Sequence, residues 1–142
     1  MAKKKAVRRR ISCAVGVCDP SRTQGLEAPA PKGEHSLVTL RGPGVFVAAH
    51  VSKQGGKTGL TFVDLTIDGR NVTNISFAAA KNLGLTQQNP YGLVLLSAAS
   101  MIKNLTIGFP TPLTFKKSLK LSVNVQETGV VQILGNVIHG SL

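Results

Sequence analysis

The sequence is poor in aromatic residues, with no tryptophan, one tyrosine and five phenylalanines. A core built from it must be filled mainly by valine, leucine, isoleucine and alanine, and few rings are left to stack on exposed nucleic-acid bases. Hydrophobic residues still make up 42% of the chain and charged residues only 16%, which favours a folded chain over wholesale disorder. At 142 residues the chain suits a single domain.

Acidic residues are also scarce, because six Asp and Glu stand against 17 Lys and Arg and the formal net charge is +11. Positive charge is densest in residues 1–35. Six cations fall within the first ten residues: Lys3, Lys4, Lys5, Arg8, Arg9 and Arg10. Such a cluster can contact nucleic-acid phosphates without reading sequence. It can equally contact an acidic protein surface or act as a solubilising tail, and the sequence leaves these alternatives open.

Long apolar runs are missing as well. None approaches the roughly 18 residues that a membrane-spanning helix needs, and the apolar stretch after the basic cluster is too short for a secretory signal. Residues 1–35 contain Pro20, Pro29 and Pro31 and show little hydrophobic periodicity. We therefore predict a soluble protein in which residues 1–35 form a flexible basic arm and linker and residues 36–142 form one folded domain.

Residue types that bind metals are few and scattered. The histidines His35, His50 and His139 form no close-spaced ligand motif, and Cys13 and Cys18 lack the second pair that a structural zinc site requires. Because no cysteine follows Cys18, no disulfide framework is expected in the domain, and a reducing compartment is the simpler assumption. The sequence predicts no metal and no cofactor.

Catalytic side chains are equally sparse. The folded segment offers three carboxylates, of which Asp68 and Glu127 fall at apparent turns, so Asp64 is the one we expect to be buried, as a hydrogen-bonded structural residue. Residues 55–58, Gly-Gly-Lys-Thr, resemble the end of a phosphate-binding loop, but Val51 stands where that loop requires glycine and a strand follows instead of a helix. We interpret residues 55–58 as a hairpin turn and expect no enzymatic activity.

The folded segment consists of short β-branched runs separated by Gly, Asn and Pro, which is typical of an antiparallel β domain. Alternation of apolar and polar residues is clearest over Leu119–Gln126. Asp68-Gly69 is a favoured hairpin pair, and one short helix is predicted over Ala78–Leu85, ending at Gly84. The other predicted strands are Ser36–Arg41, Val45–Ser52, Leu60–Ile67, Asn71–Phe77, Leu93–Ser97, Leu105–Gly108, Leu113–Phe115 and Val130–Ile138.

About eight strands at this spacing, without alternating helices, predict an all-β fold. We expect an antiparallel β-sandwich or jelly roll carrying an extended N-terminal arm and at most one short helix. An open barrel with a similar number of strands is the alternative, because the number of strands alone does not distinguish a barrel from a sandwich.

Three stretches of the folded segment together resemble small bacteriophage virion β-sandwich proteins: SLVTLRGPGVFVAAHVSKQGGKTGLTFVDLTIDGR, LTIGFPTPLTFKKSLKLSVNV and VVQILGNVIHG. In that group a glycine-rich strand pair leads into a strand ending in Ile-Asp-Gly, and a later strand precedes a final strand ending in glycine. The resemblance covers about residues 36–142 and implies a capsid, decoration, spike-base or tail-connector component. It transfers no functional residue, and the basic arm and the two cysteines lie outside it.

The expected function is thus a non-enzymatic structural part of a virus-like assembly, found in the virion and in the host cytoplasm before assembly. Its expected partners are further copies of itself, other virion proteins and, through the arm, nucleic acid bound without sequence preference. The alternatives are a nucleic-acid-binding module that uses the arm, and a carbohydrate- or surface-binding β-sandwich. No membrane partner is expected.

Overall fold

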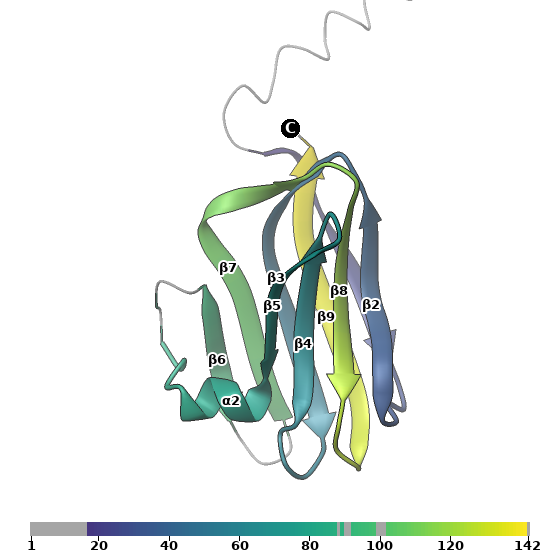
Figure 1. Cartoon of the computed structure of the whole chain (residues 1–142), viewed down its shortest axis with the longest axis vertical. Helices are drawn as coiled ribbons and strands as arrows, with labels where there is room; N and C mark the ends of the chain where they lie inside the picture. Colours follow the sequence, from purple (N-terminus) through teal and green to yellow (C-terminus); the bar gives the residue numbers. More distant parts are fainter. Residues whose placement is uncertain (1–16, 88, 90–91, 99–101, 142) are drawn as a thin grey trace, which may run out of the picture.

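The computed structural model describes residues 17–87, 89, 92–98 and 102–141, and these form a two-layer antiparallel β-sandwich (Figure 1). One sheet has five strands in the order β1-β9-β3-β7-β6, and the other has four in the order β2-β8-β4-β5. The prediction of an all-β sandwich or jelly roll is confirmed. The strands are β1 (Cys18–Glu27), β2 (Gly33–Arg41), β3 (Gly44–Gly55), β4 (Thr61–Ile67), β5 (Arg70–Ser76), β6 (Leu93–Ala98), β7 (Ile102–Phe115), β8 (Ser118–Val125) and β9 (Val130–Ser141).

The strand pairs are nested along the chain. β1 pairs with β9, β2 with β8 and β3 with β7, and the tight hairpin of β4 and β5 lies innermost. Successive pairs fall alternately in the two sheets, as when one long hairpin is rolled up on itself. This is the jelly-roll arrangement, in which strands distant in sequence lie side by side.

The core fills the space between the sheets with aliphatic side chains, as the composition predicts. Along β4 the buried residues alternate with half-buried ones, and along β8 Leu119, Leu121, Val123 and Val125 are all fully buried. Because side chains of a strand point alternately to its two faces, each strand gives one row to the core. Phe46 and Phe77 are the largest fully buried apolar side chains.

The predicted domain boundary near residue 35 is wrong, because β1 begins at Cys18 and pairs along its length with β9. β1 is an edge strand, and most of its side chains are exposed. An exposed edge strand needs no hydrophobic alternation, so this segment has the composition of a linker. Residues 1–16, which include the six N-terminal cations, lie outside the described residues.

Two further expectations are corrected. Residues predicted as the separate strands Leu105–Gly108 and Leu113–Phe115 belong to the single strand β7. Its pairing with β3 jumps from Phe46 opposite Leu113 to Ala48 opposite Gly108, so residues 109–112 form an irregularity. Both prolines of β7 fall in that irregularity, where regular pairing is already interrupted.

The prediction of a hairpin turn at residues 55–58 is also wrong. These residues lie where the chain crosses from β3 in one sheet to β4 in the other.

The predicted short helix is confirmed as α2 (Phe77–Asn82), which lies at the end of the sandwich beside β6 (Figure 1). The Ser76 side chain caps it by accepting a hydrogen bond from the Ala79 N–H group, and Phe77 and Ala80 are buried. Gly84, with φ of +73°, follows the helix, as the sequence predicts.

Gly25 is required by the close approach of the two sheets at their β1 edge. A Cβ atom there would overlap the main-chain carbonyl oxygen of Leu37 in β2. Gly25→Ala is therefore expected to lower the free energy of unfolding by about 1–3 kcal/mol, the usual cost of overpacking, as measured by urea denaturation. Gly108→Ala is the matched control, because the nearest atom to its Cβ would be 4.0 Å away. Equal stability losses in the two variants would contradict this explanation.

Candidate functional site: a basic cleft and a neutral sheet face

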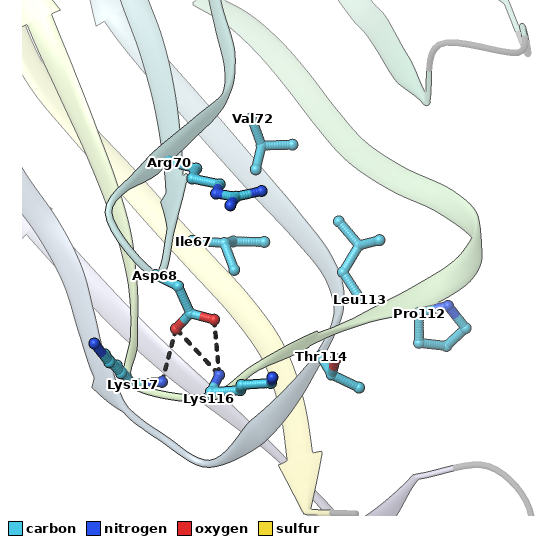
Figure 2. Close-up of a pocket in the computed structure, with 9 residues that line it drawn as sticks. All are labelled: Ile67, Asp68, Arg70, Val72, Pro112, Leu113, Thr114, Lys116 and Lys117. Atoms are coloured by element: carbon cyan, nitrogen blue, oxygen red, sulfur yellow. Dashed lines mark hydrogen bonds between the residues drawn. The ribbon is translucent and has the colours of Figure 1, made fainter.

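The first candidate site is a cleft at the end of the sandwich where β4 turns into β5 and β7 turns into β8. Its volume is about 660 Å³. The lining residues, shown in Figure 2, are Ile67, Asp68, Arg70, Val72, Pro112, Leu113, Thr114, Lys116 and Lys117. The cleft thus combines an aliphatic wall with three cationic side chains.

Asp68 fixes the geometry of this cleft. It occupies the hairpin turn with a positive φ of +52°, followed by Gly69 at +79°, which explains the choice of Asp-Gly at this position. Its carboxylate accepts hydrogen bonds from the main-chain N–H groups of Lys116, Lys117 and Ser118 at 2.7–3.1 Å. The two turns are therefore tied together, and these N–H bonds lower the pKa of Asp68 from its ordinary value.

Among the described residues the cations of the cleft form no salt bridge, although Lys116 interacts electrostatically with Asp68. Within the described part of the chain the ion pairs are His35 with Glu27 and Lys53 with Glu127, and neither involves the cleft. Three cations and the ionised Asp68 leave a net charge of +2 on the lining. Arg41 adds a further exposed cation at this end, since its register partner is Ser118 at the start of β8.

The second candidate site is the outer surface of the five-stranded sheet. The pairing registers align β1, β9, β3 and β7, and the outward positions form three rows across them. We call this set the neutral face; it consists of Arg22, Ile138, Ala48 and Gly108, then Gln24, Asn136, His50 and Thr106, then Leu26, Leu134, Ser52 and Asn104. Arg22 is its only residue with a formal charge, although the whole chain carries +11.

The neutral face is also partly apolar and hollowed. Leu26 is 56% exposed and Ile138 44% exposed, which is high for large aliphatic side chains. A hollow of about 290 Å³ lies over its centre, lined in part by Arg22, His50 and Asn136. The side-chain oxygen of Asn136 is buried there and, among the described residues, has no hydrogen-bond partner. The opposite sheet differs, since its outward positions include Glu34, Asp64, Lys120 and Arg41.

The buried carboxylate of the protein is Glu127, and the expectation that it would be Asp64 is wrong. Glu127 is 4% exposed, whereas Asp64 is only half-buried and accepts hydrogen bonds from Thr66 and Asn71. The Glu127 carboxylate accepts bonds from Lys53 Nζ at 2.8 Å and Thr61 Oγ1 at 2.6 Å. Glu127 was predicted to lie in a turn, because no local sequence pattern indicates its partner Lys53, which is 74 residues away.

The Gly-rich segment 55–59 completes this buried site. The main-chain N–H groups of Thr58 and Gly59 donate to Glu127 Oε1, each at 3.1 Å. A side chain on Gly56 would overlap that carboxylate, so glycine is required there. The segment that resembles a phosphate-binding loop therefore holds an internal carboxylate, and its anion site is already filled by the protein itself.

The remaining sequence expectations concern metals and cysteines. The described residues contain no cluster of three or more His, Cys, Asp or Glu side chains able to hold a metal ion. His35 and His139 contact Pro31 and Thr23 respectively, and His50 lies on the neutral face, so the structure does not bring the three together. Cys18 is buried and disulfide-bonded, which goes against the expectation of a reducing compartment. Cys13 lies outside the described residues.

Taken together, the topology places this chain in the structural class of antiparallel jelly-roll sandwiches. Neither a family model nor a curated protein sequence matches it. In the portion of the chain that the structure describes, α2 is far too short to cross a bilayer, and no membrane-spanning helix is found.

Proposed function

We propose that this protein is a non-enzymatic structural component of a virus-like assembly, of the minor capsid, decoration, spike-base or tail-connector kind. It would act in the virion and reside in the host cytoplasm before assembly. The neutral face carries the proposal, because a chain with a net charge of +11 repels its own copies over most of its surface. A face with one charge and exposed leucine and isoleucine is where two copies can meet with little repulsion.

The geometry of the neutral face supports a second copy of this chain as its occupant. A two-fold contact uses the same patch on both partners, so the patch must be compatible with itself in charge. Neutral amides, small residues and aliphatic side chains satisfy that condition. The resemblance of residues 36–142 to small phage virion proteins supports the same role.

The proposal is tested by measuring the mass of the purified full chain with light scattering over a range of protein concentrations. We expect a defined oligomer that persists at high salt, because an uncharged contact is insensitive to screening. A strictly monomeric chain at all concentrations would reject the proposal.

A nucleic-acid-binding role is the second candidate, favoured by the concentration of positive charge. Deleting residues 1–10 removes six cations, and each lost phosphate contact lowers the salt dependence of binding to single strands by about 0.7 in log–log slope. We expect weaker, less salt-dependent binding of the truncated chain in a fluorescence anisotropy titration. Unchanged affinity and slope would show that the arm does not contact nucleic acid.

A further inference from the structure

We propose that the cleft between the β4–β5 and β7–β8 turns binds the phosphodiester backbone of a single-stranded nucleic acid. Arg70 and Lys116 come from different turns and converge on one hollow. Figure 2 shows the Arg70 guanidinium beside Val72 and the Lys116 side chain along the lower edge near Thr114. A planar guanidinium and a flexible ammonium on opposite sides of a cleft can contact adjacent phosphates of one strand.

The positive charge of the cleft is available to a ligand. Arg70, Lys116 and Lys117 are all exposed, and none is ion-paired within the described residues. Asp68 is the one carboxylate in the lining, and its oxygens already accept three main-chain N–H bonds. Its negative charge offsets one of the three cations, so the lining keeps a net charge of +2.

The apolar wall distinguishes a nucleotide chain from a small inorganic anion. Ile67, Val72, Pro112 and Leu113 line the cleft alongside the cations, so a ligand with both phosphates and less polar sugar or base surfaces fits it. No aromatic residue is present for base stacking, so the contact should be tolerant of sequence. A concave site of about 660 Å³ also suits one strand better than the convex surface of a duplex.

The cleft lies at the end of the sandwich where β1 begins and β9 ends. Cys18 pairs with Ser141 at the same end of the sandwich, and Gly42 there donates a hydrogen bond to the Lys117 carbonyl oxygen. Figure 1 shows the start of β1 at this end, near the C-terminal end of β9.

The test compares two double variants of the full chain that lose the same charge. Arg70→Gln/Lys116→Gln alters the cleft, and Lys57→Gln/Lys81→Gln alters exposed lysines near the β3–β4 crossing and in α2 at the opposite end. Binding of fluorescein-labelled oligothymidylate and oligouridylate is measured by anisotropy at several salt concentrations. All four positions are exposed, so thermal unfolding should confirm that both variants fold.

We expect the cleft variant to bind about tenfold more weakly than the wild type and to lose about 1.4 in log–log salt slope, for two phosphate contacts. The opposite-end variant should stay within about twofold. Equal losses in the two variants would mean that only net charge matters and would overturn the proposal. Competition by polyglutamate as strong as that by the oligonucleotide would overturn the choice of nucleic acid. None of the residues that line the cleft belongs to the neutral face, so the outcome does not depend on whether copies associate through that face.

Discussion

Glu127→Gln is expected to lower the free energy of unfolding by about 3–5 kcal/mol, because it leaves the Lys53 ammonium charged and buried without a counter-ion. The Lys53 and Glu127 side chains are 1% and 0% exposed, and their charged atoms are 2.8 Å apart. The Phe77 ring lies 5.5 Å from Lys53 Nζ and would be its remaining electrostatic partner. Urea denaturation followed by far-UV circular dichroism provides the measurement.

Two further variants separate this explanation from a general loss of packing. Glu34→Gln makes the same change at an exposed glutamate and should stay within about 0.5 kcal/mol of wild type. Lys53→Met/Glu127→Gln removes both charges but keeps an oxygen for the N–H groups of Thr58 and Gly59, so it should recover much of the loss. A double variant no more stable than Glu127→Gln would show that the unpaired charge is not the cause.

The stability should also depend on acid in a defined window. Burial alone would raise the pKa of Glu127, but hydrogen bonds from Lys53, Thr61 and Gly59 outweigh it and lower the pKa from 4.5 to about 2. Because the folded-state pKa is depressed, the stabilisation is complete above about pH 4.5 and is lost as pH falls toward 2. The difference in stability between wild type and Glu127→Gln should therefore shrink over that interval. A constant difference would contradict this assignment.

Ile138→Lys is expected to weaken self-association at least about 100-fold. The substitution places a second cation beside Arg22, its register partner on the neutral face, and like charges across an interface cost several kcal/mol. In a two-fold contact the new charge enters from both copies. Ile138 is 44% exposed, so the fold should tolerate the change. Sedimentation velocity measures the shift from oligomer to monomer.

Thr39→Lys provides the matched control for this experiment. Thr39 is exposed on β2, in the four-stranded sheet, whose outer positions already carry charges of both signs. Thr39→Lys should leave the oligomer intact, although it adds the same charge to the chain as Ile138→Lys. Dissociation by both variants to the same extent would indicate general electrostatic repulsion and not a specific contact through the neutral face.

The strands that face the core were predictable because burial on one side leaves a period-two pattern. β8 shows this pattern clearly, with Leu119, Leu121 and Val123 in the core. The Asp68-Gly69 pair likewise marks the hairpin of β4 and β5. β1 was missed because an edge strand with mostly exposed side chains has no such pattern. The sequence predicts two strands where β7 is one, because prolines normally end a strand. That the two prolines of β7 fall in an irregularity becomes visible only from the pairing of β7 with β3.

The candidate sites were less predictable because they depend on which strands become neighbours. Asp68 and Arg70 lie more than 40 residues from Lys116, and only the tie between their two turns makes them one cleft. The neutral face likewise combines positions from four strands that no local window contains together. Strand periodicity could have flagged Ala48, His50 and Ser52 as an uncharged outward row of β3, but not the rows beside it.

Electron cryo-microscopy of the native assembly is the decisive test of contact through the neutral face, since it shows which surface of the sandwich meets a neighbouring copy. We expect particles in which Arg22, His50 and Ile138 of one copy lie against the same five-stranded sheet of another. Particles in which that sheet faces solvent in every copy, with contacts made through the four-stranded sheet instead, would contradict it.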